Sequence, residues 1–210
     1  MTKRIRELVK RIPKVNTLID VGCDHGKITY YALKEGKVKK GICTDISAPS
    51  LSKAKLLVGG EFPKTEFYVA DGIPQNCPPF DFTVIAGMGG EEIVKILKNT
   101  QNVNRALLQP MNNVPFIRVE LVKMGYKILS DEIFIDDKFY NVICVEKGTD
   151  CLTEEEIFFG RTNLVNKTQD FIAYVEREIV KTEEILKGIS KENKRFCELS
   201  HYLDHLRKII

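Results

Sequence analysis

The chain has 210 residues, of which 43% are hydrophobic and 29% charged, and its formal net charge is +3. This length and apolar content suffice for one ordinary α/β core with an appendage. No apolar run reaches the 18 residues typical of a membrane-spanning helix, and the charged start, Met1 to Arg4, lacks the apolar stretch of a secretory signal. We therefore expect no membrane partner.

Cysteine usage points to a reducing compartment. The six cysteines form no C-x-x-C pair and fall mostly in apolar segments: Cys23, Cys43, Cys77, Cys144, Cys151 and Cys197. Such residues are typical of reduced, small side chains rather than disulfides or metal ligands. We expect a cytoplasmic protein, a monomer without a bound metal.

Positive charge is concentrated at the beginning of the chain. Residues 1–14 hold six cations against the single acid Glu7, namely Lys3, Arg4, Arg6, Lys10, Arg11 and Lys14. Apolar residues at helical spacing predict a helix that ends before Pro13, with the cations on its outer face. Such a face favours contacts with nucleic-acid phosphates, and we expect Arg4, Arg6 and Lys10 to make them. The alternative is an ordinary solvated helix face.

The stretch from Asp20 to Gly26 (DVGCDHG) has the pattern of a ligand-binding turn. An apolar strand, Thr17 to Val21, contains an acid near its end, and glycines follow two and six residues after that acid. A helix-like pattern then covers Ile28 to Leu33. Strand, glycine-containing turn and helix form the ligand-binding corner of a doubly wound sheet. An ordinary strand–helix turn is the alternative.

The acids of this turn bear on the class of ligand. A dinucleotide fingerprint has glycine where Asp24 stands, and Asp20 and Asp24 would repel a pyrophosphate. A cofactor without phosphate and with positive charge fits better, and S-adenosylmethionine carries a sulfonium and an ammonium group. A nicotinamide oxidoreductase is thereby disfavoured.

Acids or glycines follow the next three predicted strands. Gly41 to Asp45 ends in an acid suited to ribose hydroxyls, and Asp71-Gly72 follows the strand from Phe67 to Ala70 in a position suited to adenine. The fourth strand, Phe80 to Ala86, leads into Gly87-Met88-Gly89-Gly90. Each of the acids Asp20, Asp45 and Asp71 could by itself be an N-cap or turn residue. Together, at three successive strand ends, they favour a cofactor site.

The remaining pattern completes the predicted sheet. Ser47 is expected to cap a helix that closes at Gly59-Gly60, and helices are also expected after Gly90 and from Phe116 to Met124. Further strands are expected at 105–108, 126–135 and 140–147, the last two joined by a hairpin turn. We predict a Rossmann-like, seven-stranded methyltransferase sheet over residues 1–150.

Residues 151–210 are predicted to form a separate helical domain. Thr153 and Glu156 form a capping box, and apolar residues then recur every three or four positions in two runs. We interpret them as two long helices in an antiparallel hairpin or coiled coil. His201 and His205 have a spacing that can bind a metal, but the sequence shows no third ligand, so we expect no metal site.

Four segments together resemble the TrmK family: Asp20 to His25, Val84 to Gly90, Leu108-Gln109-Pro110 and Glu156 to Gly160. These bacterial tRNA methyltransferases modify N1 of the adenosine at position 22, in the D arm. The resemblance covers nearly the whole chain. It implies a Rossmann-like catalytic domain, a C-terminal coiled-coil domain, S-adenosylmethionine as methyl donor and tRNA as partner.

The predicted site residues fall into three groups. We expect the acid Asp24 to act on the target base, with His25 beside it; a helix cap is the alternative for Asp24. Gln109, Pro110 and Asn112 are expected to contact the substrate. The predicted cofactor-binding residues are Asp20, Gly22, Cys23, Gly26, Asp45, Ile46, Asp71, Gly72, Ala86, Gly87 and Met88.

Two further alternatives stay open at this point. The chain could methylate a different RNA adenosine, or it could be a non-catalytic RNA-binding module that retains the cofactor fold.

Overall fold

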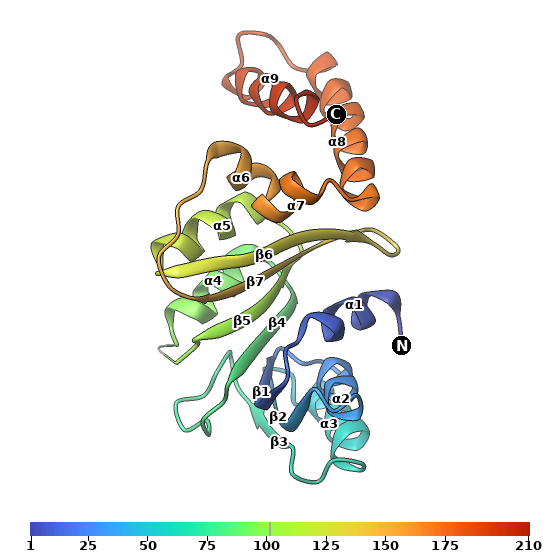
Figure 1. Cartoon of the computed structure of the whole chain (residues 1–210), viewed down its shortest axis with the longest axis vertical. Coiled ribbons are helices and arrows are strands. Elements are labelled where there is room, and N and C mark those ends of the chain that lie inside the picture. Colours follow the sequence, from blue (N-terminus) through green and yellow to red (C-terminus); the bar gives the residue numbers. More distant parts are fainter. Residues whose placement is uncertain (101) are drawn as a thin grey trace.

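The computed structural model describes residues 1–100 and 102–210. Its centre is a seven-stranded sheet with the strand order β3-β2-β1-β4-β5-β7-β6 (Figure 1). The strands are β1 (Val15–Val21), β2 (Val38–Asp45), β3 (Glu66–Val69), β4 (Phe82–Met88), β5 (Arg105–Pro110), β6 (Tyr126–Ile135) and β7 (Phe139–Lys147). The predicted seven-stranded sheet is confirmed.

Strand direction fixes where a ligand can bind. β1 to β5 pair in parallel, whereas β7 is antiparallel to both β5 and β6. β1 lies between β2 and β4, so the chain leaves β1 toward one side of the sheet and later returns on the other. The carboxyl ends of β1 and β4 therefore flank the topological switch point, where doubly wound sheets bind their ligands.

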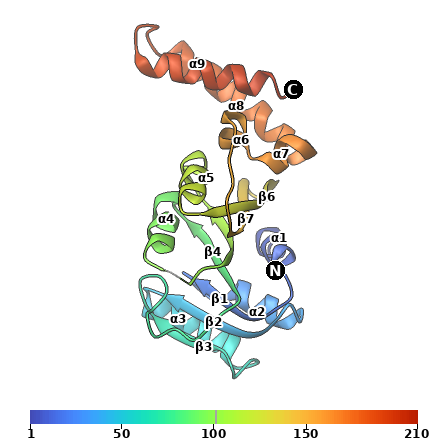
Figure 2. The same ribbon diagram turned by 60° about the vertical axis from the view of Figure 1, so that its left-hand side comes forward.

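Helices cover both faces of the sheet (Figures 1 and 2). Alternate residues of β1 serve the two faces: Leu18 packs in the cluster with α1 and α2, and Ile19 and Val21 pack in the cluster with α4 and α5. The helices around the sheet are α1 (Lys3–Arg11), α2 (Lys27–Lys34), α3 (Ala48–Ala54), η1 (Lys55–Gly59), α4 (Gly90–Lys98) and α5 (Val114–Lys123).

Several predicted boundaries are confirmed and a few shift. Ser47 caps α3 as predicted, and this helix continues as the π-helical turn η1 before Gly60. Thr2, which was not predicted as a cap, caps α1. β4 begins at Phe82 rather than Phe80, because Asp81 instead accepts hydrogen bonds from two backbone N–H groups at the start of β1. Across the described residues no helix is long and apolar enough to cross a membrane.

Two long C-terminal helices are present as predicted, but two short helices that were not predicted from the sequence precede them. The segment after Thr153 forms four helices: α6 (Glu154–Phe159), α7 (Arg161–Asn166), α8 (Gln169–Lys187) and α9 (Lys194–Arg207). Gly160 and Lys167 separate the first three because both have positive φ angles, 84° and 42°, that end a right-handed helix. α8 and α9 pack against each other, and α7 and α8 contact β6.

A buried ion pair joins the sheet to these helices. The Arg118 guanidinium of α5 donates through Nε and Nη2 to the Asp131 carboxylate of β6, and both side chains are 1% exposed. Nη1 donates to the carbonyl oxygens of Ile157 and Phe158 in α6, at 2.9 and 2.8 Å. A Cβ at Gly160 would lie 2.6 Å from Asp131 Cγ, so only glycine fits there. Arg118 therefore holds α6 against the sheet.

We predict that Arg118→Met lowers the free energy of unfolding by about 3–5 kcal/mol, because it leaves the Asp131 carboxylate buried without its partner. The exposed Lys123, which pairs with Glu120 at 3.0 Å, is the matched control, and Lys123→Met should cost at most about 1 kcal/mol. Urea denaturation measures both. Equal losses in the two variants would contradict the assigned role of Arg118.

Candidate active site

The first acid of the glycine turn is buried beneath the crevice. Asp20 is 1% exposed, and its Oδ2 accepts a hydrogen bond of 2.9 Å from Thr29 Oγ1 of α2. Burial raises the pKa of Asp20 to about 6, and the charge of Asp45 adds to the rise, whereas hydrogen bonds from Thr29 oppose it. Burial therefore destabilises the ionised form of this carboxylate, and a nearby cation would stabilise it.

The turn itself depends on glycine and on left-handed backbone. Gly22 has φ 67°, and a Cβ there would lie 1.9 Å from Met88 Cε of β4. Asp24 also has a positive φ, 49°, and its backbone N–H donates to Asp45 Oδ2 at 2.9 Å. Asparagine and aspartate tolerate this conformation better than most residues. The turn thus brings the ends of β1, β2 and β4 together.

Asp24 and His25 form a solvent-accessible pair. His25 Nδ1 lies 2.8 Å from Asp24 Oδ2, and the Asp24 side chain is 67% exposed. The residue that caps α2 is Gly26, without a side-chain hydrogen bond. The helix-cap alternative for Asp24 is therefore not what the structure shows, and its carboxylate faces the crevice.

The two downstream acids occupy successive strand ends. Asp45 ends β2, where its Oδ1 accepts from Ser47 N–H at 2.8 Å and its Oδ2 from Asp24 N–H. It is thus a turn residue, as the alternative reading held, and it also lines the pocket. Asp71 follows β3, and its Oδ2 lies 3.3 Å from Lys95 Nζ. Gly72 and the exposed Ile46 lie beside these acids in the same pocket wall.

Glycines near the end of β4 and at the start of α4 leave space along the opposite wall of the pocket. A Cβ at Gly87 would lie 2.9 Å from Arg4 Nη2, and one at Gly90 would lie 2.9 Å from the Asn112 carbonyl oxygen. Gly90 N–H donates to Asn112 Oδ1 at 3.1 Å, so Asn112 fastens the start of α4 to the loop after β5. Side chains at these positions would displace Arg4 or that loop.

These walls enclose a pocket of about 380 Å³ and an adjoining one of about 210 Å³, which share Arg4, Gly22, Asp24 and Ala86. The larger volume lies within the range of small-molecule sites. Five carboxylates but only two permanent cations line the two pockets: Asp20, Asp24, Asp45, Asp71 and Glu92 against Arg4 and Lys27. The balance favours a positively charged ligand and disfavours a pyrophosphate.

Arg4 lines both pockets, and the sequence did not predict this position for it. Its backbone N–H donates to Asp136 Oδ2 at 2.8 Å, and its Nε donates to Gln109 Oε1 at 2.9 Å. The guanidinium carbon also lies 5.5 Å from the centre of the Tyr140 ring. The side chain is therefore fixed at the pocket wall, whereas Arg6 and Lys10 of the same helix are exposed.

The structure places some predicted residues away from the pocket lining. Gly26 is not in its wall; a Cβ there would lie 2.9 Å from Val58, so it serves helix packing. Gln109 and Pro110 are buried at the end of β5, and Gln109 holds Arg4. Cys23 lines only the smaller pocket, and the Cys43 thiol together with burial raises its pKa, which keeps it a neutral thiol.

Sequence reasoning missed the contributions of α4. Glu92 and Ile96 line the larger pocket from this helix, and Ala70 lines it from the end of β3. Glu92 and Ile96 are four residues apart, so they lie on one helix face, and that spacing was the available signal.

Comparison with known proteins now identifies the family. A model of the family described as "TrmK: tRNA (adenine(22)-N(1))-methyltransferase" matches residues 18–208. The chain belongs to the TrmK family. This confirms the family resemblance that was based on the glycine turn, the segment from Val84 to Gly90, Leu108-Gln109-Pro110 and Glu156 to Gly160.

Relatives extend over most of the chain. A curated protein of Mycoplasma pneumoniae named "Putative tRNA methyltransferase" is 32% identical over 179 residues, which is 80% of this chain and 83% of that protein. The tRNA (adenine(22)-N(1))-methyltransferase of Bacillus subtilis is 26% identical and covers 100% of this chain and 97% of its own length.

Solved structures of the family have the same fold. The structure of M. capricolum TrmK in complex with S-adenosyl-homocysteine is 26% identical, covers 99% of this chain and 96% of its own, and has a TM-score of 0.88. This similarity confirms the predicted Rossmann-like methyltransferase fold.

We predict that Asp20→Asn stabilises the cofactor-free protein at neutral pH and not in acid. The folded-state pKa of about 6 lies above the ordinary 3.8, so the stability that Asp20 contributes is complete below pH 3.8 and is lost as the pH rises through 6. At about pH 7.5 the ionised, buried carboxylate costs about 1–3 kcal/mol, which asparagine avoids.

Urea denaturation at about pH 4 and about pH 7.5 measures the difference between wild type and variant, with the exposed Glu184→Gln as control. The advantage of Asp20→Asn should grow with pH, while the control shows no such trend. A difference that is the same at both pH values would contradict the assigned pKa.

Proposed function

We propose that this chain transfers the methyl group of S-adenosylmethionine to N1 of the adenosine at position 22 in the D arm of tRNA. Family membership supports the reaction, and so does the acid-lined pocket at the carboxyl ends of β1 and β4, which suits a sulfonium and ammonium cofactor. The chain thus acts as an S-adenosylmethionine-dependent tRNA methyltransferase.

The pocket residues fit this cofactor from end to end. Asp45 accepts one N–H bond at each oxygen, and each oxygen keeps a further lone pair for a ribose hydroxyl. Asp71, Gly72 and Ile46 lie beyond it, where an adenine would contact an acid, a backbone group and an apolar side chain. At the other end, Gly22, Gly87 and Met88 leave space next to the buried charge of Asp20, where the amino-acid end would lie.

Methylation at N1 does not require the protein to remove a proton from the base first. Bound S-adenosylmethionine supplies an electrophilic methyl carbon on a positively charged sulfur. N1 of adenine has a free lone pair at neutral pH and attacks that carbon without prior deprotonation, and the electrons of the broken carbon–sulfur bond remain on sulfur. The chain must therefore extrude the base, hold N1 in line and exclude water.

Asp24 is placed to stabilise the charge that develops on the base. The methylated ring is cationic, and a carboxylate near its amino group would favour that charge. Asp24 lines both pockets, its backbone is fixed by Asp45 and its side chain by His25. Arg4, held by Gln109, lines the same two pockets and would exclude solvent from the reacting atoms.

The exposed face of α1 would bind the RNA backbone. Arg6 and Lys10 point to solvent on this helix, whose first residues reach the pocket. Phosphate contacts there would position the D arm without reading its sequence. Asn112, exposed on the loop after β5, would approach the substrate from the other wall.

Domain division, location and oligomeric state form part of the same proposal. Residues 1–150 would supply catalysis and 151–210 a helical domain that contributes to RNA binding. We also propose that the chain acts as a monomer. A tRNA substrate and six cysteines without disulfides support a cytoplasmic location.

Transfer of labelled methyl from S-adenosylmethionine to unmodified tRNA tests the proposal. We expect label on tRNA with adenosine at position 22 and none when guanosine replaces it. Label on both tRNAs would disprove position 22 as the methylated site. Label on neither would disprove tRNA as the substrate.

We predict that Asp24→Asn lowers turnover by about 100-fold or more while it changes cofactor affinity by less than about threefold, because its carboxylate acts on the base. Asparagine suits the positive φ of this position. Asp71→Asn is the matched control and should show the reverse, with weaker cofactor binding and near-normal turnover at saturation. Parallel losses of turnover and affinity in Asp24→Asn would refute the catalytic role.

We predict that Arg6→Gln and Lys10→Gln together weaken tRNA binding and reduce its salt dependence by about one unit of slope per lost phosphate contact. The control replaces Lys123 and Lys127, two exposed cations at the end of α5 and near the start of β6. Binding isotherms at several salt concentrations give the slopes. An unchanged slope in the α1 double variant would show that this helix face is only solvated.

A further inference from the structure

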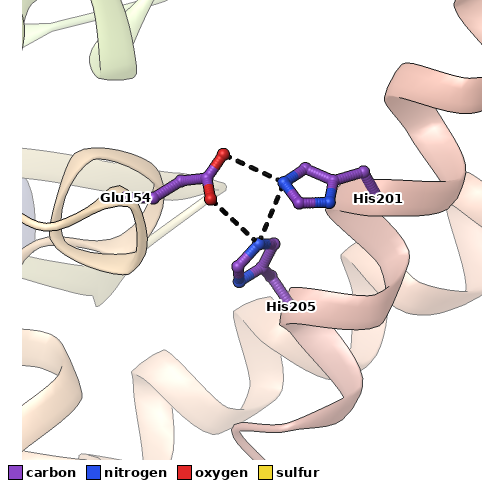
Figure 3. Close-up of side chains that lie close together, drawn as sticks. All are labelled: Glu154, His201 and His205. Atoms are coloured by element: carbon purple, nitrogen blue, oxygen red, sulfur yellow. Dashed lines mark hydrogen bonds and ion pairs between the residues drawn. The ribbon is translucent and has the colours of Figure 1, made fainter.

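Three potential metal ligands meet between α6 and α9 (Figure 3), and none of them lines the pockets of the proposed active site. His201 Nε2 lies 2.9 Å from Glu154 Oε1 and 3.1 Å from His205 Nε2. His205 Nε2 lies 3.5 Å from Glu154 Oε2. Glu154 is the first residue of α6 and lies 47 positions before His201 in the sequence, so the fold alone brings it to the histidine pair.

The spacing matches that of ligands around one zinc ion. Zinc binds imidazole nitrogen and carboxylate oxygen at about 2.0–2.1 Å in tetrahedral geometry, which separates neighbouring ligand atoms by about 3.3 Å. The two imidazole nitrogens are 3.1 Å apart, and each lies 2.9 or 3.5 Å from one of the two Glu154 oxygens, so all three separations are close to that value. Two imidazole nitrogens and a carboxylate form a donor set that zinc commonly uses.

Hydrogen bonding satisfies this arrangement only in part. A single proton on His201 Nε2 could serve either Glu154 or His205, but not both well, and the remaining pair is 3.5 Å apart. Three electron-pair donors that converge on one point are better satisfied by a shared cation than by one proton.

The surroundings of His205 resemble the support that metal-binding histidines usually have. Its side chain is 5% exposed, and its Nδ1 lies 3.2 Å from Glu155 Oε1. That nitrogen is fully buried and makes no well-directed hydrogen bond among the residues that the structure describes. A carboxylate next to the distal nitrogen orients the ring and directs the other nitrogen toward a metal. The Phe158 ring, 5.6 Å from that of His205, adds an apolar wall.

We propose that Glu154, His201 and His205 bind one zinc ion, with water as fourth ligand and Glu155 as the carboxylate that orients His205. The ion would fasten the end of the chain to α6, which Arg118 in turn fastens to the sheet. The site is a structural one and is independent of the proposed methyl transfer. It reverses the expectation of no metal, which rested on the lack of a third ligand in the sequence.

Zinc titration of the full-length protein without an affinity tag, in competition with a chromophoric chelator, tests this site. Glu154→Gln and His201→Asn remove ligands whose side chains are 55% and 54% exposed, so both variants should fold. Asp204 is exposed on α9, the helix that carries His201, and Asp204→Asn is the matched control. Glu155→Gln should weaken zinc binding by about 10-fold through the loss of support for His205.

We expect the wild type to bind one zinc ion per chain and to unfold at a higher temperature with zinc present. Glu154→Gln and His201→Asn should lose at least 10-fold in zinc affinity and the thermal shift, while Asp204→Asn keeps both. The proposal is overturned if the wild type binds no stoichiometric zinc, or if both ligand variants bind it as the wild type does. Circular dichroism confirms that each variant is folded.

Discussion

The parallel pairing of β1 with β4 is the constraint on which the site depends. It places the end of β1, with Asp20 and the glycine turn, directly beside Met88 and the glycines that follow β4. The turn can approach so closely only because Gly22 has no side chain. Once those two ends are fixed, β2 must bring Asp45 to the same edge, where it receives the Asp24 backbone N–H. The acid-lined pocket is thus a consequence of sheet topology and one glycine.

A second set of contacts joins α1 to this edge. Gln109 is buried at the end of β5 and accepts from Arg4, while Asp136 of the hairpin turn accepts the Arg4 backbone N–H. The two hydrogen bonds tie the basic helix to the end of β5 and to the turn between β6 and β7. α1 therefore places Arg4 in the pocket wall and exposes Arg6 and Lys10 on its outer face. The same helix would thus link the cofactor pocket with the proposed RNA-binding face.

Much of this could be predicted from the sequence because strand ends carry local signals. The acid and glycine spacing around Asp20, Asp45 and Asp71 depends on neighbouring residues alone, and all three lie at one edge of the sheet. The pocket role of Arg4 could not be predicted, since its partner Gln109 is 105 positions away. For the same reason Glu154 was not recognised beside His201. The break at Gly160 was missed because its cause, the buried Asp131 carboxylate, lies in a distant strand.

Calorimetric titration of the cofactor-free protein with S-adenosylhomocysteine and, separately, with NADH tests most directly whether the acids at the switch point select the ligand. The account predicts one S-adenosylhomocysteine per chain, no NADH binding, and at least about 10-fold weaker binding in Asp45→Ala, which loses the proposed ribose acceptor. Binding of NADH, or unchanged affinity in Asp45→Ala, would contradict it.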